Sequence, residues 1–235
     1  MRKSLFIKAI GHAVPIALAY FSVSFGFGIM AEKAGLTVWQ AAVLSITNLT
    51  SSGQVAGVGV IAAGGTYLET AMTQLVINLR YALMGLSLTQ KLDEKYTLPQ
   101  RLITAYGLTD EVFVLASAQD KVKPWYMYGL LAASMVSWTS GTMLGAAAGQ
   151  ILPTVLADAM GIILYGMFLA LFSPAAKKEK SVLLVVCVAA ACSVLFHYVF
   201  TAVSGGFALI ISTVVASVVG AVLHPIPVEE EGVET

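Results

Sequence analysis

Eight uncharged residues, Thr47-Asn48-Leu49-Thr50-Ser51-Ser52-Gly53-Gln54, interrupt an otherwise apolar run from Val38 to Ala63. All of them except Leu49 carry a hydroxyl or an amide or are glycine. In hydrocarbon an unpaired polar group costs several kcal/mol, so non-helical backbone survives there only inside protein or beside a water-filled cavity. The stretch therefore predicts a break in a membrane helix, at a place where a substrate can be held.

The composition is typical of an integral membrane protein. Of the 235 residues, 58% are hydrophobic and 11% are charged, and the mean hydropathy is +0.84. A soluble domain is about one-quarter charged. Because a spanning helix needs about 20 apolar residues, we expect a single transmembrane transporter domain over residues 1–235, with short loops.

Several kinds of chemistry have no support in the sequence. The net charge is zero and no basic patch is interleaved with aromatic residues, so nucleic acid is not an expected partner. Cys187 and Cys192 lie in an apolar segment without metal-binding spacing, and His12, His197 and His224 are far apart. We therefore expect no metal site, no cofactor and no catalytic residues, and we predict that the protein is not an enzyme.

We predict an all-α polytopic fold with about eight membrane segments. The expected segments cover about residues 10–31, 38–63, 67–88, 100–119, 125–152, 154–172, 182–200 and 207–223. The hydroxyl-rich stretch 137–142 predicts a second break, inside the fifth segment. The fourth segment carries several polar and charged residues, so we expect its neighbours to shield it from lipid.

The two expected breaks indicate an internal repeat. Repeat one covers about residues 10–88, repeat two about 100–173, and a C-terminal helix pair covers about 182–223. Each repeat has three segments with an interrupted middle helix, and an odd number of crossings would give the repeats opposite topology. Matched interrupted segments in two halves are a sequence signature of a transporter's binding site. Sequence matches at spacings of 86 to 88 residues support the pairing: Ala19-Tyr20 with Ala105-Tyr106, Trp39 with Trp125, and Ser52-Gly53 with Ser140-Gly141.

The sequence is compatible with two topologies of the segments. If every segment crosses once from a cytoplasmic N-terminus, eight basic residues lie inside and four outside. If segments two and five are re-entrant hairpins instead, the counts are nine and three. Both versions agree with the positive-inside rule.

Charged residues inside apolar segments are the candidates for a charge network. An arginine at the centre of a spanning helix costs about 2.5–3.5 kcal/mol on insertion scales, so Arg80 should face the bundle interior and pair there. Asp110 and Glu111 supply possible partners, and one of them could carry a proton. Two alternatives remain: Arg80 forms a purely structural ion pair, or Asp110 and Glu111 are solvated at an interface.

Neutral polar residues near the breaks are the candidates for substrate binding. Opened helix ends expose N–H groups that favour a carboxylate, and hydroxyl or carbonyl oxygens can accept from an ammonium group. The alternative is that the hydroxyls bond back to the preceding turn of a continuous, bent helix. The candidate residues are Thr47, Asn48, Ser51, Ser52, Gly53, Gln54, Asn78, Ser137, Thr139 and Ser140.

Three pieces of the sequence together resemble the AzlC family: Gly53-Gln54-Val55-Ala56-Gly57-Val58, Asn78-Leu79-Arg80-Tyr81-Ala82-Leu83-Met84-Gly85, and Leu108-Thr109-Asp110-Glu111. This family is the large subunit of a two-component bacterial exporter of branched-chain amino acids. The resemblance covers nearly the whole chain. It implies export of valine, leucine, isoleucine and related apolar amino acids, and a small, separately encoded membrane partner of the AzlD type.

The sequence thus predicts a secondary transporter of the bacterial cytoplasmic membrane, with lipid, an amino acid and a small subunit as partners. Proton coupling is a hypothesis based on the two carboxylates and on the absence of an ATP-binding motif. Two alternatives of other classes remain: an intramembrane enzyme using Asp110 and Glu111, and a passive channel or structural membrane subunit.

Overall fold

The structure is a computed structural model that describes residues 2–153 and 173–224, together with positions 155, 162, 166 and 169. Within these residues the regular elements are all helical, with one isolated bridge between Leu92 and Val122. The predicted all-α polytopic membrane fold is confirmed. The chain divides into two compact units, residues 1–167 and 168–235, and each is described by itself.

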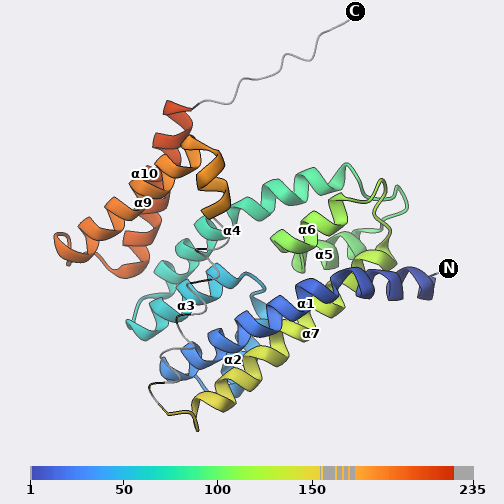
Figure 1. Cartoon of the computed structure of the whole chain (residues 1–235), viewed down its shortest axis with the longest axis horizontal. Helices are drawn as coiled ribbons and strands as arrows, with labels where there is room; N and C mark the ends of the chain where they lie inside the picture. Colours follow the sequence, from blue (N-terminus) through green and yellow to red (C-terminus); the bar gives the residue numbers. More distant parts are fainter. Residues whose placement is uncertain are drawn as a thin grey trace, which may run out of the picture. The chain divides into compact units, whose positions relative to one another are not determined.

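Helices α1 and α7 form the framework of the first unit. α1 covers Arg2–Lys33 and α7 covers Pro124–Gly149, and the two lie side by side along most of their lengths (Figure 1). Gly129 faces Ala9, Gly145 faces Phe25 and Gly149 faces Glu32. Residue numbers rise together on both helices, so the pair is parallel and has one N-terminal end and one C-terminal end.

Glycines allow this close packing. A methyl group on Gly28 would overlap the backbone of α7 at Thr142, and one on Gly145 would overlap the Phe25 carbonyl of α1. Small residues let helix backbones approach in membrane proteins, where van der Waals contact replaces the hydrophobic driving force. The α1–α7 pair is therefore held by backbone contact rather than by interlocking large side chains.

Helices α5 and α6 form a hairpin at the N-terminal end of the α1–α7 pair. α5 covers Leu98–Tyr106 and α6 covers Asp110–Ser117. The loops before α5 and after α6 are joined, because Val122 donates to the Lys91 carbonyl at 2.8 Å and its own carbonyl accepts from Asp93 at 3.0 Å. Since Val122 immediately precedes α7, the α5–α6 hairpin leaves this end and returns to it.

Helices α2 and α3 form a second hairpin, at the opposite end. α2 covers Val38–Thr47, α3 covers Ser51–Ala62 and α4 covers Tyr67–Thr89. α2 follows the end of α1 and runs back along α7, where Ser45 and Thr142 hydroxyls lie 2.8 Å apart. α3 runs antiparallel to α4, which ends beside the loop of Lys91. The α2–α3 hairpin therefore starts and finishes at the C-terminal end of the pair.

Two predicted segments differ from the structure. The fourth, about residues 100–119, was expected as one helix but is broken at 107–109 between α5 and α6. Thr109 begins a new helix there by accepting from the Val112 N–H at 3.4 Å, and a side chain at Gly107 would overlap Leu131. The α2–α3 break at residues 48–50 is confirmed.

The expected break in the fifth segment is wrong, because α7 is continuous through residues 137–142. The hydroxyls of its two serines bond to carbonyl oxygens instead of opening the helix: Ser140 donates to the Ser137 carbonyl at 3.1 Å, and Ser137 donates across to the Ala17 carbonyl of α1. The second repeat, as predicted over 100–173, therefore lacks an interrupted middle helix. The sixth segment, about 154–172, lies almost wholly outside the described residues.

The second unit contains the predicted C-terminal helix pair. α9 covers Lys180–Tyr198 and α10 covers Gly205–Leu223. The helices pack closely where Gly220 meets Val185. Together with α1, they are the described helices that are long and apolar enough by composition to span a membrane.

Candidate functional site

The α2–α3 break is held open by a buried glutamine. Gln54 is fully buried, and its amide nitrogen donates to the Asn48 carbonyl inside the break. Its amide oxygen accepts from the indole N–H of Trp138 on α7 at 3.0 Å. Because an indole can only donate, Trp138 fixes which way the Gln54 amide points. α7 thus stabilises the break although it is not itself broken.

A second glutamine, Gln74 of α4, holds the other side of the break. Its nitrogen donates to the Gly53 carbonyl at 2.7 Å, and its oxygen accepts from Asn48 at 3.1 Å and from Asn78 at 3.2 Å. A methyl group on Gly53 would overlap the side chains of Thr50 and Gln74. Glycine is therefore required at position 53 for α4 to contact the start of α3.

Arg80 connects the two hairpins. Its Nη1 lies 2.8 Å from the Asp110 carboxylate at the start of α6. Its Nη2 lies 3.5 Å from the Ser52 hydroxyl at the start of α3 and 3.1 Å from the Tyr81 hydroxyl. The guanidinium also lies over the Tyr81 ring, 4.9 Å from its centroid. One half-exposed cation is thereby shared by two helix starts that come from opposite ends of the unit.

Glu111 contacts a different partner from its neighbour Asp110. The Tyr20 hydroxyl of α1 lies against the Glu111 carboxylate and 2.7 Å from the Thr109 hydroxyl. The Tyr20 ring makes an edge contact with Trp138, with centroids 5.3 Å apart. Adjacent residues on a helix point about 100° apart, which gives the two carboxylates different partners: α4 for Asp110 and α1 for Glu111.

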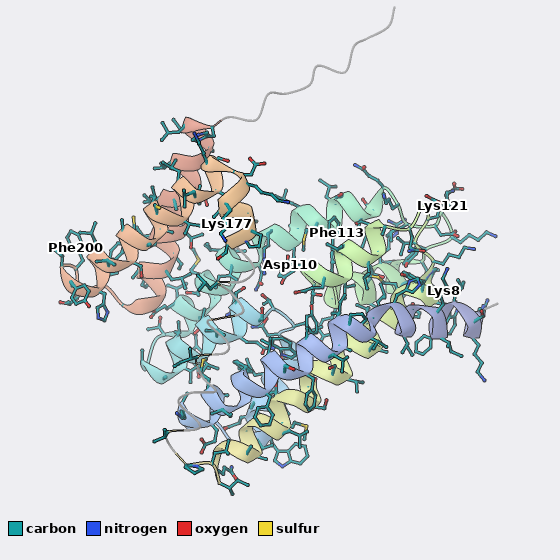
Figure 2. The ribbon with its side chains drawn as sticks, in the orientation of Figure 1. Lys8, Asp110, Phe113, Lys121, Lys177 and Phe200 are labelled. Carbon is teal, nitrogen blue, oxygen red and sulfur yellow. The ribbon has the colours of Figure 1, made fainter. Side chains whose placement is uncertain are left out.

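The tips of the two hairpins touch directly. Tyr106, the last residue of α5, places its hydroxyl against the carbonyl of Ile46, near the end of α2. Arg80 bridges the starts of α3 and α6 from the α4 side, and Tyr20 reaches α6 from the α1 side. Residues of α1 and α4 and of both hairpins therefore contribute to the site. Asp110 is labelled in Figure 2, at the start of α6.

A comparison with known protein families identifies the family of this chain. A family model described as AzlC protein matches residues 15–152. The chain belongs to the AzlC family.

Two relatives support this assignment. The chain is 29% identical to the inner membrane protein YgaZ of Escherichia coli over 195 residues, which cover 79% of this chain and 78% of that protein. It is 30% identical to an uncharacterized membrane protein of Archaeoglobus fulgidus over 175 residues, covering 74% and 77%. No solved structure matches.

The AzlC match contains both hairpins, Arg80 and its partners, but excludes α9 and α10. The pair expected between Arg80 and one of the two carboxylates forms with Asp110. Asn48, Ser52, Gly53, Gln54 and Asn78 all belong to the network around the α2–α3 break. Their roles in binding stay predictions.

Other predicted residues lie elsewhere. Thr47 bonds back to the Val43 carbonyl at 2.8 Å, so its hydroxyl closes the last turn of α2. Ser51 is the first residue of α3. Ser137 and Ser140 bond to carbonyls of α1 and α7, and Thr139 lies on the same unbroken helix. The second break predicted in segment five is therefore absent, and the second broken segment is α5–α6. The roles of Ser137, Thr139 and Ser140 in substrate binding stay predictions.

The sequence predictions missed five residues of this candidate site: Tyr20, Gln74, Tyr81, Tyr106 and Trp138. Gln74 had a signal, because it is an amide residue inside an apolar helix, one turn before Asn78. The aromatic residues had no such signal, since tyrosine and tryptophan are ordinary in membrane helices.

Among the described residues, no group of three His, Cys, Asp or Glu side chains could hold a metal ion.

Proposed function

We propose that this protein is a secondary transporter that exports branched-chain or similar apolar amino acids across the bacterial cytoplasmic membrane. The position of Arg80 is the observation that carries the proposal. Its guanidinium contacts Asp110 of one hairpin and Ser52 of the other. Carriers hold substrate where discontinuous helices meet, and a cation there complements a carboxylate.

Arg80 is the proposed partner of the substrate carboxylate. A guanidinium binds a carboxylate through two parallel N–H groups. In the structure Nη1 contacts Asp110, whereas Nη2 donates to neutral hydroxyls, that of Tyr81 at 3.1 Å and that of Ser52 at 3.5 Å. The Arg80 side chain is 41% exposed, so a solute can reach it. A bound carboxylate would compete with Asp110 for Nη1 and displace the Ser52 contact.

Asn78 is the proposed partner of the substrate ammonium. Its amide nitrogen is used by Gln74, but its amide oxygen is buried and has no hydrogen-bond partner within the described part of the chain. Buried acceptors are nearly always satisfied in proteins, and an ammonium group brings three donors. Asn78 reaches the start of α3 through Gln74, and Arg80 reaches it through Ser52, so one amino acid can contact both.

Proton coupling is proposed because the substrate carboxylate and the Asp110 carboxylate would compete for the Arg80 guanidinium. Protonation of Asp110 would release Arg80 for the substrate carboxylate, which couples the two events. The test is amino acid flux in proteoliposomes with and without a pH gradient, at a clamped membrane potential. Unchanged flux would exclude coupling and leave transport itself standing.

We also propose that the chain works with a small membrane subunit of the AzlD type, as the family resemblance implies. Co-purification of a tagged chain with the product of a neighbouring small membrane-protein gene tests this. Recovery of the chain alone, with full transport, would contradict it.

The central experiment is counterflow of labelled leucine in proteoliposomes containing the purified protein. We expect saturable exchange that unlabelled valine and isoleucine inhibit. Flux that rises linearly with concentration would indicate a channel, and release of products from a lipid or peptide without exchange would indicate an intramembrane enzyme. Either result would overturn the proposal.

A further inference from the structure

Basic residues gather at one end of the first unit. Eight exposed lysines and arginines lie at or near the N-terminal end of the α1–α7 pair: Arg2, Lys3, Lys8, Lys91, Lys95, Arg101, Lys121 and Lys123. Lys33 is the one basic residue at the opposite end in the described part of this unit, and Arg80 lies between. Lys8 and Lys121 mark the basic end in Figure 2.

The hairpin topology creates this imbalance. A chain that crossed the membrane at every segment would put Lys91, Lys95 and Arg101 on the side opposite Arg2. The structure returns the α5–α6 hairpin to its starting end through the pairing of Leu92 with Val122. The guanidinium of Arg2 also lies 5.9 Å from the centre of the Trp125 ring, which places the starts of α1 and α7 together. All eight basic residues therefore share one end.

An excess of lysine and arginine in short loops marks the cytoplasmic side of a membrane protein. We infer that the N-terminal end of the α1–α7 pair faces the cytoplasm. The α5–α6 hairpin is then the inner hairpin, which separates the Arg80 site from the cytoplasm, and the α2–α3 hairpin is the outer hairpin. The gating part of this inference rests on the proposed function. The orientation rests only on the distribution of lysine and arginine between the two ends.

The two hairpins are built alike, which supports equivalent roles. Each begins with a threonine whose N–H donates to a glutamine three residues later: Thr37 to Gln40 at 2.8 Å and Thr97 to Gln100 at 3.0 Å. Each breaks at a Leu-Thr pair, 49–50 and 108–109, whose threonine caps the returning helix. The spacing between equivalent residues is 59 or 60.

The helices that precede the two hairpins, α1 and α4, are also alike. Tyr20 of α1 and Tyr81 of α4 lie 61 residues apart, and both contact the site: Tyr20 through Glu111 and Tyr81 through Arg80. A long helix followed by a hairpin thus occurs twice, in opposite directions. Inverted repeats of this kind let a carrier open to either side around one fixed site.

The contacts of Arg80 assign a role to Asp110. The 2.8 Å ion pair joins the inner hairpin to α4, whereas the outer hairpin is joined to α4 by neutral hydrogen bonds of Gln74, which donates to the Gly53 carbonyl at 2.7 Å and accepts from Asn48 at 3.1 Å. In the inferred orientation, the ion pair is therefore the charged contact between α4 and the hairpin on the cytoplasmic side. A substrate carboxylate or a proton on Asp110 removes this ion pair and leaves the inner hairpin held by the contacts of Tyr20 and Tyr106.

Cysteine labelling tests the orientation without requiring transport. Starting from a Cys187→Ser, Cys192→Ser chain, Lys95→Cys probes the basic end and Tyr67→Cys, 97% exposed, probes the opposite end. In intact cells a membrane-impermeant maleimide should label Tyr67→Cys, and should label Lys95→Cys only after permeabilisation. The reverse pattern would overturn the orientation, whatever the transport assay shows.

A third probe tests the inner hairpin. Ser51 is the first residue of α3, directly after the α2–α3 break, and Ser51→Cys places the label there. In inside-out vesicles we expect Asp110→Asn to raise its labelling rate at least tenfold, with no rise in right-side-out vesicles. A rise from the outside, or no rise from either side, would overturn the assignment. Unchanged sidedness of Lys95→Cys and Tyr67→Cys in the Asp110→Asn background shows that the variant is folded.

Discussion

Arg80 and Asp110 form an ion pair of 2.8 Å between the middle of α4 and the first residue of α6. The two side chains are 41% and 34% exposed, so the described protein atoms do not fully cover either partner. The contact between a guanidinium and a carboxylate is a charge-assisted hydrogen bond whose geometry depends on the planar fork of arginine.

Replacing Arg80 by lysine should lower leucine exchange at least tenfold although the charge is kept. A lysine is a point charge on a flexible stem and lacks the planar fork that contacts Asp110 and Ser52 together. Exchange in proteoliposomes measures the effect. Arg101→Lys, at an exposed position on α5, is the matched control and should retain exchange. Equal activity of the two variants would show that charge alone is sufficient.

Replacing Asn78 by leucine should weaken binding of leucine but not of 4-methylpentanoate, which has the same side chain and carboxylate but no amine. The change removes the buried amide oxygen that is proposed to accept from the ammonium. We expect a loss of about tenfold, the value of one hydrogen bond of about 1.4 kcal/mol. Equal losses for both ligands would contradict the assignment and indicate a general distortion of the site.

Replacing Gly145 by alanine should destabilise the protein by about 1–3 kcal/mol, the usual cost of overpacking. The added methyl would meet the Phe25 carbonyl, which is backbone and cannot rotate away. Gly11→Ala on α1 is the control, because no atom lies within 4 Å of the new methyl. Alanine there should keep or slightly raise stability. Thermal unfolding in detergent compares the two, and equal midpoints would exclude the close α1–α7 contact.

The Gln54–Trp138 hydrogen bond should appear as a coupling energy. Trp138→Phe leaves the buried Gln54 oxygen without its donor and should cost about 1–3 kcal/mol. Gln54→Leu removes the acceptor, so the double variant should lose less than the sum of the single losses. Residues in contact couple by about 0.5–3 kcal/mol. Additive losses, measured by thermal unfolding, would mean that the contact does not stabilise the break.

The sequence could predict the features that cost free energy in lipid. Thr47 to Gln54 were expected to break a helix because so many polar groups cannot remain unpaired in hydrocarbon. Arg80 was expected to find a carboxylate for the same reason, and it pairs with Asp110. These predictions rest on local chemistry, which a single chain displays directly.

The sequence could not distinguish hydroxyls that open a helix from hydroxyls that bond back to it. Ser137 and Ser140 donate to carbonyls, so α7 stays whole, whereas Gly107-Leu108-Thr109 contains one hydroxyl and still breaks. What decides the second break is Gly107 against Leu131 and the cap at Thr109. The first is a contact between distant residues, which a single sequence does not display. The second, a threonine followed by Asp110 and Glu111, is a local helix-start signal that the sequence prediction did not use.

The hydrogen bond between Gln54 and Trp138 also bears on how the protein is made, because the two residues are 84 positions apart. Ribosomes add about 5–20 residues per second, so about 4–17 s pass between synthesis of Gln54 and synthesis of its donor. Polar groups without partners are not stable in hydrocarbon, so during that interval the broken stretch needs water or another protein around it. The α2–α3 break can therefore gain its hydrogen bond to Trp138 only after α7 has been synthesised.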